Sequence, residues 1–194
     1  MQIDRKLNLV VPVDLGTVSG YVHAMPISRE VWETYFLVLA KTYAAILSEG
    51  LTVISGPPIA RMLLKRVAQM SGVWEGQEGV ERGLLPEIRR LCNIVMPTGQ
   101  GWETLPFEAA LQRNLIDADA LAEAEGAIIF FICASAVLRG PQARAKLMIL
   151  LNGLQSLWGA STTSSDVTAF AASLPTSMPA ENTGAKATAS SIPH

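Results

Sequence analysis

A long uncharged stretch dominates the hydrophobic pattern of this chain. Residues 127–138 carry no charge, and the acidic, alanine-rich residues 117–126 precede them. A helix that is apolar on all sides must be buried on all sides or lie in lipid. The uncharged run is shorter than the roughly 20 residues that a bilayer-spanning helix needs. The pattern therefore predicts a buried central helix over residues 117–138, capped by Asp117 or Asp119, with Glu123 and Glu125 favouring its N-terminal half.

Apolar residues at helical spacing predict further helices that pack around this central one. Ser28 is a suitable N-cap for a helix over 29–49. The other predicted helices cover 59–70, 84–96, 107–113 and 142–158. The residues expected to face the core are Trp32, Tyr35, Phe36, Leu39, Tyr43, Ile46, Leu47, Met62, Leu63, Val67, Leu85, Ile88, Leu91, Cys92, Val95, Phe107, Leu111, Leu147, Leu150, Leu151, Leu154, Leu157 and Trp158.

The N-terminal part of the chain is typical of strands. Residues 7–13 and 18–25 are rich in β-branched residues, and a short glycine-containing loop joins them, which predicts a β-hairpin. Pro12 lacks an amide hydrogen, so we expect it at an edge or a bulge. A lone hairpin is marginally stable in water. It must therefore lie on the helices, on a partner or in a larger sheet.

The composition changes abruptly after Trp158. The remaining residues are rich in Ser, Thr and Ala and predict an extended or disordered tail. Its sparse apolar residues could anchor it on a partner; these are Val167, Phe170, Leu174, Met178 and Ile192. We therefore predict a hairpin over 1–26, a helical domain over 27–158 and a tail over 159–194. The expected fold is a mainly α-helical bundle around a central apolar helix, with a small N-terminal β-hairpin and an irregular C-terminal tail.

Composition narrows the classes of function. The chain has 194 residues, of which 49% are hydrophobic and 16% are charged, against about 25% charged in a typical globular protein. A low fraction of charged residues leaves much of the surface neutral or apolar, and a surface of that kind favours contacts with partner proteins. The net charge of −2 and the scattered Lys and Arg residues give no basic patch for nucleic acid. Met1–Leu7 has no apolar core of the kind that a signal peptide needs, so the cytoplasm is the expected location.

Few residues could carry chemistry. The histidines are His23, which we expect at a surface or interface position in the second strand of the hairpin, and His194. His23, Cys92 and Cys133 have no spacing that predicts a zinc site, and we expect two buried free thiols, with a disulfide as the alternative. Ser28 and Ser135 are better explained as a cap and a small packing residue than as nucleophiles.

The charged candidates have structural explanations too. Asp117 and Asp119, like Glu123 and Glu125, are two residues apart on a helix and point apart. We expect Arg89 and Arg90 to be solvated, or to contact an acidic partner. We therefore predict no catalytic, cofactor-binding or metal-binding residue, no cofactor, and no enzymatic activity.

The order of features resembles one known family. A hairpin (LNLVVPV…GYVHAMPIS), a helical domain (REVWETYFLVLAKTYAAIL) and a Ser/Thr/Ala-rich tail are similar to the layout of tail assembly chaperones of long-tailed bacteriophages. The resemblance implies a homo-oligomeric protein of the host cytoplasm. It would bind the phage tape-measure protein and keep it soluble during tail tube assembly. It implies no nucleic-acid or membrane partner, and no site residue can be carried over from the family.

Two other functions fit the same sequence. The chain could be a structural virion protein of the tail or head–tail connector, with its hairpin in an intersubunit sheet. It could also be a small α-helical enzyme with a pocket between Gly72 and Trp102, in which case His23 is the residue to test.

Overall fold

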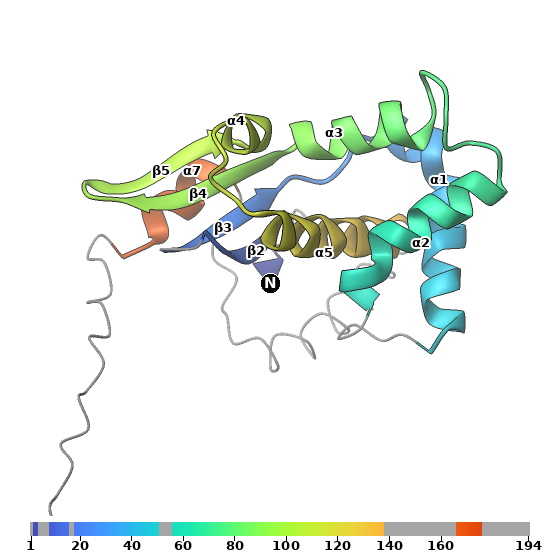
Figure 1. The fold of residues 1–194 in the computed structure, drawn as a ribbon, viewed down its shortest axis with the longest axis horizontal. Coiled ribbons are helices and arrows are strands. Elements are labelled where there is room, and N and C mark those ends of the chain that lie inside the picture. Colours follow the sequence, from blue (N-terminus) through green and yellow to red (C-terminus); the bar gives the residue numbers. More distant parts are fainter. Residues whose placement is uncertain (1, 4–7, 16–17, 51–55, 138–165, 176–194) are drawn as a thin grey trace, which may run out of the picture.

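The computed structural model describes residues 2–3, 8–15, 18–50, 56–137 and 166–175. These residues form an antiparallel sheet with helices on both of its faces (Figure 1). The elements in chain order are β1 (Gln2–Ile3), β2 (Leu9–Asp14), β3 (Ser19–Ala24), α1 (Arg29–Ser48), α2 (Gly56–Met70), the π-helical turn η1 (Val80–Leu84), α3 (Leu85–Arg90), β4 (Cys92–Thr98), β5 (Gly101–Pro106), α4 (Phe107–Gln112), α5 (Ala118–Val137) and α7 (Val167–Ser173).

The sheet has five strands in the order β1-β2-β3-β4-β5, and β1 contributes only two residues. The predicted hairpin is present as β2 and β3, paired with Pro12 opposite Tyr21. Pro12 lies beyond the two residues of β2 that pair with β1, which is the edge position expected for proline. After β3 the chain makes a helical excursion through α1, α2 and α3. It then returns beside β3, where Tyr21 pairs with Val95.

The prediction of a mainly α-helical bundle with only a small hairpin is wrong, because β4 and β5 enlarge the hairpin into a sheet. Residues 84–96 have apolar positions at helical spacing, but the helix ends at Arg90 and Cys92–Thr98 is a strand. The free edge of β3 supplies backbone hydrogen-bond partners for this segment. Residues 102–106, expected as an entry segment to a helix, form β5 and complete a second hairpin through the tight turn at Gly99 and Gln100.

The two faces of the sheet bury different cores. Alternate residues of a strand point to opposite faces, and Leu9, Val22 and Ile94 point into the main core with the helices. Val10 and Val95 point to the other face, where they form a separate small cluster with Phe170 of α7. The fold is therefore a sheet with a large helical layer on one face and one short helix on the other (Figure 1).

The predicted central helix is confirmed as α5. The Asp117 carboxylate accepts hydrogen bonds from the backbone N–H groups of Asp119 (2.9 Å) and Ala120 (2.8 Å) and caps it. Residues from Ala124 to Ala136 are buried, apart from the half-buried Ser135. By length and composition α5 could cross a membrane, but 72% of its apolar window is buried inside the protein, against α1, α2 and β2.

The helices α1 and α2 flank α5 but do not bury every residue expected to face the core. The predicted cap is confirmed, since the Ser28 hydroxyl oxygen accepts a hydrogen bond from the N–H of Val31. Phe36 and Leu47 of α1 and Met62 of α2 are exposed, contrary to prediction. Each helix has more apolar residues than the arc facing α5 can accommodate, so some of them remain at the surface.

The predicted irregular tail contains a helix. The Asp166 carboxylate accepts a hydrogen bond from the N–H of Ala169 (2.8 Å), which starts α7. Phe170 is buried, and Val167 and Leu174 pack beside it on the protein's own sheet. The predicted anchors Met178 and Ile192, and the predicted helix over 142–158, lie outside the described residues.

We expect Gly126→Ala to destabilise the fold, because α5 and the start of α2 touch at this residue. A Cβ atom there would lie 2.3 Å from the carbonyl oxygen of Pro57, which is backbone and cannot move alone. The clash should lower the free energy of unfolding by about 2 kcal/mol, after the helix propensity of alanine is allowed for. Urea unfolding measures it. Gly99→Ala is the control, because nothing lies within 4 Å of the added atom, and it should change stability by less than about 0.5 kcal/mol.

Candidate functional site

One side of α1 presents apolar residues to solvent. At 100° per residue, Phe36, Leu37, Ala40, Ala44 and Leu47 fall within an arc of about 100°. Phe36, Leu37 and Leu47 are 40%, 65% and 56% exposed. The opposite side of α1, with Val38, Leu39, Thr42 and Ile46, is buried in the core. We call this exposed arc the α1 apolar face.

The spacing within the α1 apolar face is that of a helix-packing seam. Leu37, Ala40, Ala44 and Leu47 are separated by three, four and three residues, which is the a/d pattern of a coiled coil. The alanines at its centre leave room for another helix to approach closely. Arg29 and Glu33 also lie in the arc, near its N-terminal end, where the Arg29 guanidinium pairs with the Glu33 carboxylate at 2.7 Å. From the sequence, two of these apolar residues, Phe36 and Leu47, were expected to face the core, but both are exposed.

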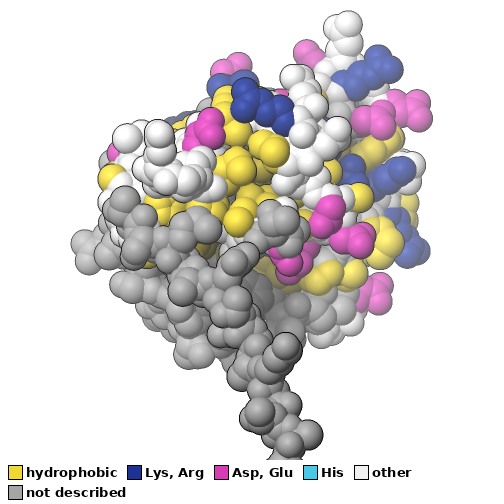
Figure 2. All heavy atoms as spheres, turned by 60° about the vertical axis from the view of Figure 1, so that its left-hand side comes forward, with side chains coloured by type: hydrophobic (Ala, Val, Ile, Leu, Met, Phe, Trp, Pro, Cys, Tyr) yellow, Lys and Arg dark blue, Asp and Glu magenta, His cyan; other side chains and the backbone are white. Residues whose placement is uncertain are grey.

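Apolar side chains reach the surface beyond α1. Met62, Met70 and Val73 are exposed on and after α2. Figure 2 brings forward the side of the molecule that carries β5 and α7 in Figure 1, and hydrophobic side chains are visible there as well, with acidic and basic side chains above and to the right of them. A surface of this kind suits binding to other apolar surfaces.

A second candidate site surrounds Glu125, in the N-terminal half of α5. This carboxylate is only 6% exposed. The Arg89 guanidinium of α3 contacts it through Nε (2.7 Å) and Nη2 (2.5 Å), and Nε of Arg61 in α2 contacts it at 2.8 Å. A buried carboxylate needs such partners, so this cluster ties three helices together.

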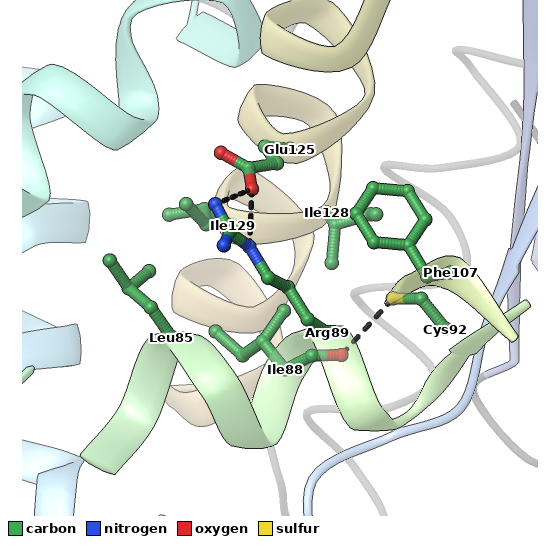
Figure 3. A pocket seen from close by; sticks show the side chains of 8 residues that line it. All are labelled: Leu85, Ile88, Arg89, Cys92, Phe107, Glu125, Ile128 and Ile129. Atoms are coloured by element: carbon green, nitrogen blue, oxygen red, sulfur yellow. Dashed lines mark hydrogen bonds and ion pairs between the residues drawn. The ribbon is translucent and has the colours of Figure 1, made fainter. Parts of the chain in front are cut away.

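A small hollow lies beside the Glu125 cluster (Figure 3). Its volume is about 250 Å³ including open solvent, and its walls are mainly apolar: Leu85, Ile88, Cys92, Phe107, Ile128 and Ile129. Arg89 crosses it to reach Glu125, and the Cys92 thiol donates a hydrogen bond to the carbonyl oxygen of Ile88 (3.1 Å). The polar groups that the hollow presents are therefore already bound to one another.

The structure places several predicted residues differently from expectation. Arg89 is only partly exposed and binds Glu125. Glu125 is a buried ion-pair partner rather than only a complement to the helix dipole. Arg90 is exposed and pairs with Glu87 of its own helix (2.7 and 2.8 Å). The hydrophobic spacing along α5 does not predict this cluster. The cluster depends on which helices pack against α5.

His23 is fully buried, whereas the sequence predicted a surface or interface position in the hairpin. It points to the second face of the sheet, with its ring 6.2 Å from the ring of Phe170. Ser135 donates a hydrogen bond within its own helix, to the carbonyl oxygen of Ile132. Among the described residues, no group of three or more His, Cys, Asp and Glu could hold a metal ion. His194 lies outside them.

Comparison of the chain with protein-family models, curated proteins and solved structures finds no match.

We expect Glu125→Gln to destabilise the protein, because it leaves Arg61 and Arg89 without their buried counter-charge. Removing one partner of a fully buried ion pair costs about 3–5 kcal/mol. Both arginines are partly exposed, so we expect about 2 kcal/mol, measured by urea unfolding. Glu123→Gln is the matched control in the same helix, because Glu123 is exposed. An equal effect of the two variants would contradict a structural role for the cluster.

The buried thiols should make stability fall at high pH. Both cysteines are buried and free, as predicted. Burial, together with the charge of Glu125, raises the pKa of Cys92 from 9.0 to about 12, and burial also raises the pKa of Cys133. Above about pH 9 the unfolded chain loses these protons while the folded chain keeps them. Each thiol should then lower the free energy of unfolding by about 1.4 kcal/mol per pH unit.

Urea unfolding at pH 8 and pH 10 tests this. Cys92→Ala should remove about half of the thiol-dependent loss, because Cys133 remains. Tyrosine and lysine titrations are common to both proteins and cancel in the comparison. An identical pH dependence of the two proteins would contradict the assignment.

Proposed function

We propose that this protein binds apolar helices of another polypeptide and keeps that polypeptide soluble, without a catalytic step. Its client would be a tape-measure protein, and the protein would act as a tail assembly chaperone of a long-tailed bacteriophage. The observation that carries the proposal is the α1 apolar face, an exposed arc with the spacing of a helix-packing seam. The proposal includes self-association along the client, in the host cytoplasm.

The chemistry of the α1 apolar face supports a helical client. An a/d seam accepts a partner helix whose own apolar residues repeat every three and four residues. Long proteins with such repeats aggregate when their seams are exposed. A protein that covers those seams with an apolar arc of its own would keep them in solution.

The α1 apolar face can be tested by adding charge to it. Leu37→Glu with Leu47→Glu changes two exposed side chains, so the fold should persist. Each leucine buried against a client contributes about 1.5 kcal/mol or more, so the double variant should bind about 100-fold more weakly. The assay is co-expression with an apolar heptad segment of a tape-measure protein, followed by measurement of the soluble fraction of that segment.

The control adds the same net charge elsewhere on α1. Thr34→Glu with Lys41→Gln also lowers the charge by two and lies outside the arc, on the exposed polar side. This control should solubilise the segment as well as the unchanged protein does. If the unchanged protein leaves the segment insoluble, or if both double variants behave alike, the proposal is wrong. Many copies of the chain in purified mature particles would favour a structural virion protein instead.

A further inference from the structure

The outward side of α2 is basic and carries no acidic residue. Its exposed residues are Pro58, Arg61, Met62, Lys65, Arg66, Gln69 and Met70. At 100° per residue they span an arc of about 180°, and the opposite side of the helix is buried against α1 and α5. Neither Asp nor Glu occurs anywhere in α2. We call Arg61, Met62, Lys65, Arg66 and Met70 the α2 basic strip.

Two methionines lie among the cations of this strip. Met62 and Met70 are 63% and 79% exposed. The helical spacing places Met62 between Lys65 on one side and Arg66 on the other. Basic residues alone would be explained by solubility. The methionines leave apolar surface in water, which a bound partner would bury, and an unbranched thioether adapts to an irregular partner surface.

The cations of the α2 basic strip are open to a partner. The Lys65 ammonium lies 5.5 Å from the centre of the Trp74 ring, and this attraction keeps it beside the strip. Arg61 binds Glu125 through Nε, but 49% of its side chain is exposed, so its guanidinium has further N–H groups to donate. No described residue forms an ion pair with Lys65 or Arg66.

We propose that the α2 basic strip docks an acidic amphipathic helix of a partner protein. Met62 and Met70 are eight residues apart, which is about 12 Å along the helix axis. Two apolar residues of a partner helix, seven or eight positions apart, would cover them. Carboxylates beside those residues would pair with Lys65 and Arg66, and such charge complementarity selects the partner and its register. The strip shares no residue with the α1 apolar face, so the inference goes beyond the proposed function.

The surroundings of the strip favour a helix over an anionic lipid surface. A helix that lies on a bilayer inserts a whole apolar face, but the apolar side of α2 is buried in the main core and only the methionines could enter. Glu75, Glu78 and Glu81 are exposed in the segment after α2. A broad anionic surface would repel these carboxylates, whereas a single narrow helix along α2 can avoid them.

Binding of a synthetic peptide to the full-length protein tests the proposal. The probe is a fluorescent helical peptide with two leucines seven positions apart and glutamates on both sides of each leucine, and the readout is fluorescence anisotropy. The protein should bind it, more weakly at high salt because exposed ion pairs are screened. Lys65→Gln with Arg66→Gln should weaken binding about tenfold, because two ion pairs are lost. Met62→Gln with Met70→Gln should weaken it at least tenfold, because apolar contact is lost.

The matched control for charge is Lys41→Gln with Arg113→Gln, which removes two exposed basic residues elsewhere and should leave peptide binding unchanged. Leu37→Gln with Leu47→Gln removes the α1 apolar face without adding charge and should also retain binding, which separates this inference from the proposed function. Circular dichroism establishes that each variant is folded.

Three results would overturn the inference. The first is that the peptide does not bind, or that a peptide with lysines in place of the glutamates binds equally well. The second is an equal loss of binding in the Lys65/Arg66 variant and in the Lys41/Arg113 control. The third is binding to phosphatidylserine vesicles, through Lys65 and Arg66, in preference to the peptide, which would make the strip a membrane contact.

Discussion

The burial of α5 is the constraint on which the other elements depend. This helix is apolar around most of its circumference, so it needs protein on every side. The helices α1 and α2 and strand β2 supply that surround. Its close contact with α2 requires a residue without a side chain at Gly126. Among the described residues, Glu125 is the only buried acidic or basic side chain apart from His23, and two arginines from flanking helices neutralise it.

Because α5 occupies one face of the sheet, the other face must find a different cover. That cover is α7, a short helix that lies far along the chain from the strands it covers. The two sheet faces therefore differ in how firmly they are held: one belongs to a continuous core, and the other is closed by Phe170 and its few neighbours. A local opening at the second face costs less than one at the first, since fewer apolar contacts are lost.

Some apolar residues remain at the surface because the core does not bury them. A chain with 16% charged residues cannot bury all its apolar groups in one core of this size, and α1 shows the result. One side of α1 is apolar and faces α5, and part of its solvent-facing side is apolar as well. The proposed binding of a helical client uses apolar surface that is separate from the main core.

The sequence by itself determined the features that depend on local pattern. These are the hairpin of β2 and β3, the start of α1 at Ser28, the buried helix α5 with its Asp117 cap, and the two buried thiols. Tertiary structure decided what depends on contacts between distant segments. Residues 92–98 have apolar positions at both helical and strand spacing, and the free edge of β3 selected the strand. The ion pairs of Arg89 and Glu125 arise because α3 and α5 meet, and α7 forms because the sheet offers it an apolar face. No local pattern encodes these choices, since each depends on a partner surface that exists only once the chain has folded.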